Sequence, residues 1–193
     1  MLSCMEKPAA TRYPIDPLLA RRWSPRAFSD RRVEPEKLRQ LFEAARWSAS
    51  SFNEQPWRFV VATKEQPDRF ARVLGCLVEK NMLWVRAAPV LLLAFYRKTF
   101  TRNGTPNPVA LHDLGQAAAS LTIQAMALDL FVHQMSGIVP AKAREQFAVP
   151  EEFEPATAIA IGYSGDPATL PEEFRAAERA PRSRHEFGQF VFG

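Results

Sequence analysis

Residues 47–57 read WSASSFNEQPW and interrupt an amphipathic helical pattern with short hydroxyl side chains, two amides and a proline. Short polar side chains in an ordered loop after a helix often bind a polar ligand. The same composition also fits a plain polar turn between a helix and a strand. Taken alone, the stretch leaves both interpretations open.

The pattern before this stretch predicts a helix that begins near Pro35 and buries one face. Leu38, Leu41, Phe42 and Ala45 recur at the spacing of a helical stripe. The helix should end at the serine cluster.

After the stretch, Gln55 precedes Pro56, which favours an extended conformation at Gln55 and leads into a strand. The other expected elements are a helix at 66–78, a buried strand at 89–96, a loop at 97–108, a long helix at 110–130, a short strand at 131–138, a short helix at 140–147 and a buried strand at 156–163. Periodicity alone therefore predicts an α/β protein of three layers. The length of the 97–108 loop indicates a mobile flap over a site.

The long helix expected at 110–130 is apolar on most sides and rich in small residues. A helix that is hydrophobic all round must be buried, either in the centre of the monomer or between subunits. We favour a contribution to a subunit interface.

The composition is that of a globular protein with 193 residues and a formal net charge of +4, and we expect one domain over 1–193. The basic residues cluster only at 21–32 and 179–184, a pattern that indicates local anion sites and neither a nucleic-acid surface nor a membrane partner. Two cysteines and no apolar leader indicate a cytoplasmic protein.

Common catalytic motifs are missing from the sequence. It contains no GxGxxG, GxxxxGK[ST], GxSxG or HExxH motif. The three histidines are far apart, and no metal site is expected.

Three polar segments remain as candidates: residues 21–26, 50–55 and 182–184. The first offers arginines and a serine around Pro25, which prevents a regular helix. Arginine and serine donors suit a phosphate group, although a solvated basic turn has the same composition.

Together the motifs RRWSPRAF, SASSFNEQPWRF, HQMSGI, ATAIAIGY and PRSR, in this order and spacing, resemble the nitroreductase family of FMN-dependent flavoproteins. The resemblance covers roughly residues 14–187. It implies an α+β fold with a mixed, largely antiparallel sheet flanked by helices, in an intertwined homodimer. Residues 1–13 would form a flexible arm, and residues 180–193 a tail that completes the phosphate site and docks on the partner.

The resemblance also implies a role for each segment at FMN. The first segment would bind FMN through Arg22 and Ser24 at the phosphate and ribityl end, with Arg26 near the pyrimidine edge and Trp23 beside them. From the other subunit, the second would contribute Ser50, Ser51, Asn53 and Gln55. Backbone N–H groups of Ser136 and Gly137 would lie near flavin N5, and Arg182 and Arg184 would complete the phosphate site.

Two positions depart from the family pattern. Ala49 stands where proline is frequent, and Asp129 stands where glycine usually ends the long helix. Left-handed helix caps favour glycine. An aspartate at position 129 therefore calls into question the backbone geometry that leads into the next strand.

The implied activity is hydride transfer from NAD(P)H through bound FMN to a nitroaromatic, a quinone or a similar flat acceptor, by a ping-pong mechanism. No catalytic side chain is expected, because the flavin carries the chemistry. Two alternatives remain: reduction of an enone, a halogenated aromatic or a peptide azoline on the same fold, and a non-catalytic flavin-binding protein.

Overall fold

The computed structural model describes residues 5–192, so Cys4 and the first four residues of the expected arm lie outside the described chain. In chain order the elements are α1 (Pro17–Arg21), α2 (Pro35–Arg46), η1 (Ser51–Asn53), β1 (Trp57–Thr63), α3 (Pro67–Gly75), α4 (Glu79–Val85), β2 (Val90–Arg97), α5 (Ala110–Ala127), β3 (Phe131–Met135), α6 (Pro140–Phe147), β4 (Phe153–Gly162), η2 (Pro167–Thr169), α7 (Glu172–Arg179) and η3 (Phe187–Gln189).

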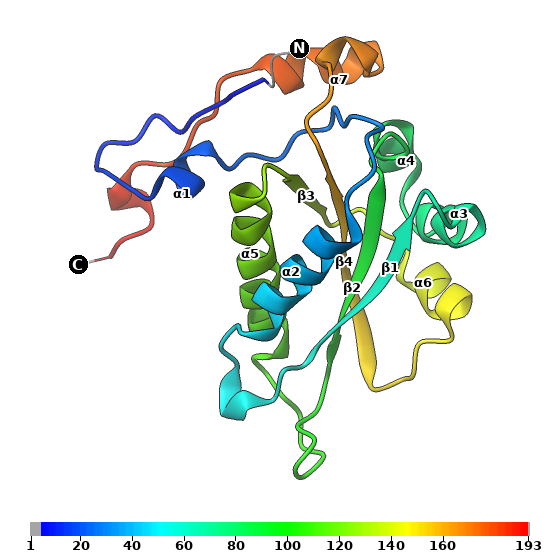
Figure 1. Cartoon of the computed structure of the whole chain (residues 1–193). Coiled ribbons are helices and arrows are strands. Elements are labelled where there is room, and N and C mark those ends of the chain that lie inside the picture. Colours follow the sequence, from blue (N-terminus) through cyan, green and yellow to red (C-terminus); the bar gives the residue numbers. More distant parts are fainter. Residues whose placement is uncertain (1–4, 193) are drawn as a thin grey trace.

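The strands form one sheet in the order β1-β2-β4-β3 (Figure 1). Trp57 lies opposite Tyr96, and Val90 lies opposite both Thr63 and Ile161. Every strand pair in the described chain is antiparallel. The α+β class with a largely antiparallel sheet is therefore confirmed.

Strand β2 is buried on both faces, as its continuous apolar sequence predicts. Leu91 and Leu93 pack into one hydrophobic cluster, and Leu92 and Ala94 pack into the other. Helices α3, α4 and α6 cover the first face, and α2 and α5 cover the second (Figure 1). The alternation of side chains along the strand thus produces the two core layers.

Most expected elements are present, with shifted ends. Helix α2 begins at Pro35 and buries Leu41 and Ala45, as predicted. The helix expected at 66–78 ends earlier, at Gly75, and α4 follows as a separate helix. Helix α7 was not predicted, because its sequence is highly charged and only Phe174 and Glu178 are buried.

Helix α5 is shorter than predicted and buries only one face in this chain. Leu111 is 55% exposed, and Gly115 and Ala119, four and eight positions after it, are also exposed. A four-residue spacing places them on one side of the helix. The single chain therefore leaves an apolar stripe of its longest helix uncovered.

Asp129 retains the left-handed backbone that glycine would normally supply, with a φ of 58°. Its carboxylate accepts a hydrogen bond from Arg21 at 3.3 Å, and both side chains are largely exposed. Aspartate tolerates this conformation better than most residues. The departure at this position therefore leaves the route from α5 into β3 intact.

Substitutions at Asp129 should separate backbone strain from charge. Asp129→Gly should not lower the free energy of unfolding, because an exposed ion pair contributes little and glycine adopts a positive φ freely. Asp129→Val should be less stable than the glycine variant by about 1–2 kcal/mol. Urea denaturation measures both values, and equal stability of the two variants would contradict the strain.

Candidate cofactor site

The segment 22–27 is extended, so its side chains alternate between the core and the surface. Trp23 and Ala27 are buried, whereas Ser24 is exposed and Arg22 is half-buried. The Trp23 ring packs edge-on against Phe131. Of the residues predicted here, the structure thus places Arg22 and Ser24 on the outside and the Trp23 ring in the core.

Arg22 and Ser24 border a cavity of about 360 Å³ between α1, α5 and β3. The Nη1 of Arg22 lies 3.4 Å from Ser24 Oγ. Small and apolar side chains of α5 form the floor, and Gln134 adds an amide at the edge. The complete lining is Leu19, Arg22, Ser24, Ala119, Thr122, Ile123, Val132 and Gln134.

Two arginines of the C-terminal segment approach this cavity. Burial, then repulsion from Arg182 and Arg184, lowers the pKa of Arg22 below its ordinary value. Burial and the charge of Arg184 likewise lower the pKa of Arg182. Arg22 therefore lies close enough to Arg182 and Arg184 for their like charges to repel one another. Such a cluster suits a polyanionic group.

Arg182 is also part of the scaffold. Its Nη1 donates to the carbonyl oxygens of Lys7 at 2.8 Å and Ala20 at 2.9 Å. These bonds tie the C-terminal segment to the N-terminal segment and to the end of α1. Arg184, by contrast, is exposed and donates only to its neighbour Ser183 in the described chain.

A buried carboxylate fixes the backbone beside Arg22 and Ser24. Glu178 is 1% exposed, and its Oε1 accepts from the N–H groups of Arg26 at 2.9 Å and Ala27 at 3.0 Å. The Arg26 guanidinium lies over the rings of Trp84 and Phe174, at 5.9 and 5.8 Å. Arg26 is thus not among the residues that line the 360 Å³ cavity.

His133 supports the same segment from β3. Its Nδ1 lies 2.8 Å from the carbonyl oxygen of Pro25, so this nitrogen carries the proton and donates. The ring packs on Trp84 at 4.6 Å. Burial lowers the pKa of His133 to about 4, although the hydrogen bond to Pro25 acts in the opposite direction. The imidazole is therefore neutral at pH 7.

This shift predicts a loss of stability in mild acid. Unfolded His133 binds a proton below pH 6.5, whereas the folded ring resists it until about pH 4. The free energy of unfolding should therefore fall between pH 6.5 and 4, by up to about 3 kcal/mol. Denaturant titrations should show a shallower fall for His133→Gln, which keeps an N–H donor, and an equal slope in both proteins would contradict the assignment.

Residues 50–55 form a strained turn. Phe52, Asn53 and Gln55 all have a positive φ, of 54°, 56° and 49°. The expectation of an extended Gln55 is therefore wrong. The hydroxyl of Ser50 accepts from the N–H of Gln55 at 3.0 Å, which closes the turn and overrides the preference set by the following proline.

The turn is anchored to the first residues of α5. The N–H of Ser51 donates to Oδ2 of Asp113 at 3.0 Å, and Asp113 is 3% exposed. Gln55 Nε2 donates to Oδ1 of Asn53 at 3.1 Å. Ser50, Ser51, Asn53 and Gln55 therefore lie together in one turn, and their contact with FMN stays a prediction.

The turn at Ser136 and Gly137 is held against α4. The Gly137 carbonyl accepts from the N–H of Val78 and from Nδ2 of Asn81, both at 3.1 Å. A Cβ on Gly137 would collide with the side chains of Asn81 and Val78, which would have to shift. The N–H of Gly137 donates to no acceptor among residues 5–192 and is free for a ligand.

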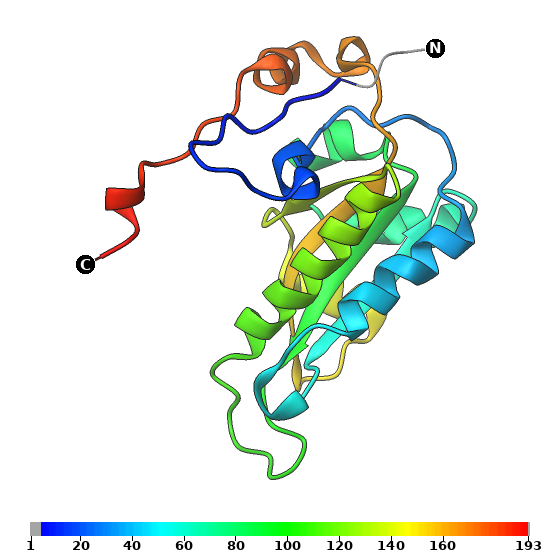
Figure 2. The same cartoon turned by 60° about the vertical axis from the view of Figure 1, so that its left-hand side comes forward.

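The two main halves of the predicted site lie at opposite ends of α5. Ser51 contacts Asp113 in the first turn of this helix, and Arg21 contacts Asp129 just beyond its last turn. Eighteen helical residues extend about 27 Å. Both views show η1 and α1 near opposite ends of α5 (Figures 1 and 2). One chain therefore does not bring residues 50–55 to the arginine cluster.

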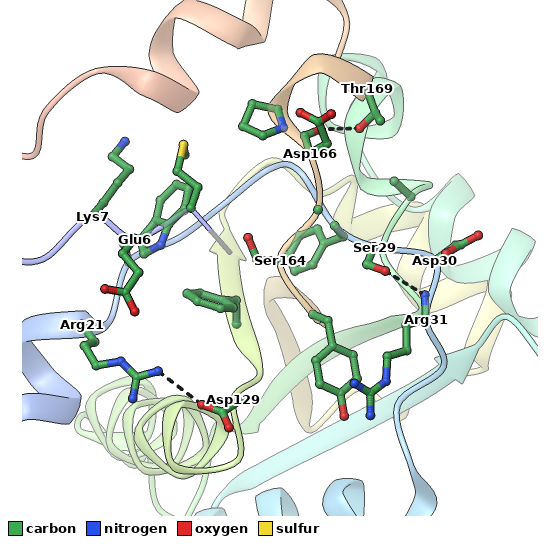
Figure 3. Close-up of a pocket in the computed structure, with 18 of the residues that line it drawn as sticks. Glu6, Lys7, Arg21, Ser29, Asp30, Arg31, Asp129, Ser164, Asp166 and Thr169 are labelled. Atoms are coloured by element: carbon green, nitrogen blue, oxygen red, sulfur yellow. Dashed lines mark hydrogen bonds and ion pairs between the residues drawn. The ribbon is translucent and has the colours of Figure 1, made fainter. Parts of the chain in front are cut away.

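A larger hollow of about 1350 Å³ lies on another side of the fold, bordered by the N-terminal segment and the residues after β4 (Figure 3). Two of its cations already have partners: Arg21 bonds Asp129, and Lys37 donates to the hydroxyl of Tyr163 at 3.0 Å. Of the predicted cofactor residues, Trp23 alone borders this hollow in the described chain. It is therefore a weaker candidate for the cofactor.

Sequence reasoning missed four polar residues that shape the site: Asn81, Asp113, Gln134 and Glu178. Asp113 could have been noticed as an acidic residue in the first turn of an otherwise apolar helix. The other three carry no local signal, because their partners are distant in the sequence. For Glu178 the separation from Arg26 is 152 residues.

Other kinds of site find no support between residues 5 and 192. No group of three potential metal ligands occurs there, and none of its helices has the length and hydropathy to cross a membrane.

A model of the nitroreductase family matches residues 19–163. Among curated relatives, a Xanthomonas oryzae protein with the provisional name NADH dehydrogenase/NAD(P)H nitroreductase is 29% identical over 81% of this chain and 87% of its own length.

Solved structures give the same result. A structure described as an oxidoreductase containing FMN is 34% identical, with a TM-score of 0.89 over 94% of this chain and 92% of its own. A nitroreductase family protein from Clostridium difficile 630 is 25% identical, with a TM-score of 0.68 over 91% of this chain and 95% of its own.

Proposed function

The chain belongs to the nitroreductase family, and on that premise we propose that it is an FMN-dependent oxidoreductase that uses NAD(P)H to reduce a flat electrophilic acceptor. The observation that carries the proposal is the cluster of Arg22, Arg182 and Arg184 beside a cavity floored by α5. The pKa values of Arg22 and Arg182 are lowered by burial and by neighbouring arginines, with no carboxylate among the causes, and such uncompensated charge fits a phosphate monoester.

The other polar groups fit the rest of FMN. Ser24 and Gln134 offer a hydroxyl and an amide beside the arginines, which suits a ribityl chain. The free N–H of Gly137 offers a donor to a ring nitrogen. Arg26 keeps its assignment to the pyrimidine edge as part of this proposal, although in the isolated chain its guanidinium lies over Trp84 and Phe174.

Bound FMN would supply the two-electron chemistry of hydride transfer through N5 between NAD(P)H and the acceptor, in the proposed ping-pong order. The chain's own groups then need only to bind and orient. Glu178 and His133 hold the 22–27 segment in place, and Asn81 holds the turn at Gly137. No side chain is assigned as a nucleophile or general base.

We further propose that the working form is a homodimer. If α5 packs antiparallel against α5 of a second copy, each end of one helix meets the opposite end of the other. Residues 50–55 of one chain would then reach the arginine cluster of its partner. The exposed stripe of Leu111, Gly115 and Ala119 supplies the apolar contact.

The C-terminal tail is a second part of that interface. Phe187, Phe190 and Phe192 are exposed in the single chain, Phe192 by 92%. The tail extends away from the body (Figures 1 and 2). Exposed aromatic clusters usually mark a contact, so docking on the partner accounts for them. A single domain over 1–193 and a cytoplasmic location complete the proposal.

The purified protein should be yellow and should oxidise NADH or NADPH when a nitroaromatic or quinone is present. Absorbance spectra and anaerobic assays measure this, with an enone and a halogenated aromatic in the same panel. A colourless protein that does not take up added FMN would refute the proposal.

Arg22→Ala and Arg184→Ala should each weaken FMN binding by about 1–3 kcal/mol, the scale of charge-assisted hydrogen bonds. Flavin fluorescence titration gives the dissociation constants. Arg39→Ala is the matched control, because Arg39 lies on the exposed face of α2 beside Glu36. Unchanged affinity in both test variants would remove the phosphate assignment.

A further inference from the structure

The loop that follows β2 is a hydrogen-bonded hairpin at the same end of the molecule as η1 (Figure 1). The N–H of Phe100 donates to Thr105 at 2.8 Å, and the N–H of Asn107 donates to Lys98 at 2.7 Å. Glu54 accepts the N–H of Thr101 at 2.6 Å, which links the hairpin to the 50–55 turn. The loop has a defined position.

An exposed aromatic platform lies where the hairpin meets the turn. Phe52 is 69% exposed and packs edge-on against the buried Phe100, with centroids 5.7 Å apart. Its φ of 54° is unusual for an aromatic residue. Such strain is unfavourable and concentrates at functional sites. The fold therefore holds a large apolar ring towards solvent at an energetic cost.

Arg102 adds a positive charge to this platform. Its Cζ lies 4.0 Å from the Phe52 centroid and 5.4 Å from that of Phe100. It is exposed, and its guanidinium makes no hydrogen bond or ion pair to residues 5–192. A guanidinium that lies over a ring keeps N–H donors along its edge, and that edge binds a carboxylate bidentately.

We propose that Phe52 and Arg102 select acceptors that are flat, aromatic and negatively charged, such as an aromatic carboxylate. The acceptor ring would pack on Phe52, and its anionic substituent would pair with Arg102. The inference rests on the proposed function, because the dimer places residues 50–55 at the cofactor of the partner. It adds a charge requirement that neither the family nor the cavity supplies.

Equilibrium binding tests the charge requirement without turnover. The FMN-loaded enzyme is titrated with 2-naphthoate and with the neutral 2-naphthamide. Binding is measured by calorimetry and by the flavin absorbance, so neither compound has to be a substrate. The naphthoate should bind more tightly, and Arg102→Gln should lower this preference roughly tenfold, about 1.4 kcal/mol. Arg102→Lys should keep part of it, and Arg39→Gln, which removes the same charge from α2, should keep all of it.

Half-reactions distinguish an anionic acceptor from the phosphates of the nicotinamide donor. Photoreduced enzyme is mixed anaerobically with 4-nitrobenzoate or 4-nitrobenzamide, and oxidised enzyme is mixed with NADH or NADPH. Arg102→Gln should lower the nitrobenzoate-to-nitrobenzamide ratio of reoxidation rates. A variant that changes only the rate of reduction by NADPH would assign Arg102 to the donor and overturn the inference.

The remaining outcomes are separable. An enzyme that binds FMN and reduces 4-nitrobenzamide, but binds naphthoate and naphthamide equally, overturns the selection by Arg102 alone. A protein that reduces neither nitro compound overturns the proposed function and, with it, the acceptor role of Arg102.

Discussion

Helix α5 separates the two polar segments of the site by its own length, and the rest of the structure depends on that spacing. The 50–55 turn is bonded to Asp113 at one end, and the segment before Arg22 is bonded to Asp129 at the other. The helix is about 27 Å long, and these two contacts lie at its opposite ends. The same helix leaves an apolar stripe uncovered, and the proposed antiparallel second copy would account for both the separation and the incomplete burial.

Buried polar anchors keep both half-sites in place before any ligand binds. Asp113 and Glu178 are almost fully buried; Asp113 accepts the N–H of Ser51, and Glu178 accepts the N–H groups of Arg26 and Ala27. His133 adds a donor to Pro25. Buried polar groups are costly unless they are hydrogen-bonded. A change in the adjacent backbone would leave these three side chains unpaired, so the fold stabilises the backbone conformations that they bind.

How much the sequence predicts depends on the range of the interaction. Helix α2 and strand β2 follow from local apolar periodicity, and the two-sided burial of β2 is confirmed. Gln55 was mispredicted because the hydroxyl of Ser50 overrides the preference set by the following proline. Glu178 could not be predicted, since its partners are more than 150 residues away.

The site itself shows the same division. Arg22, Arg182 and Arg184 were expected together at a phosphate from the resemblance; their mutual repulsion in the chain is consistent with that assignment, which stays a proposal. Phe52 and Arg102 gave no signal, because their contact depends on a turn with positive φ and on the hairpin after β2.

A mixed dimer tests the two-copy site most directly. One chain carries Arg22→Ala, and the other carries Asn53→Gly with Gln55→Gly, at positions where glycine tolerates the observed φ. The two chains are coexpressed with different tags, and dimers carrying both tags are purified. A shared site leaves one of the two sites in each dimer intact, so the account predicts about one tightly bound FMN per two chains. A site within one chain leaves every site defective, and mixed dimers without tightly bound FMN would contradict the account.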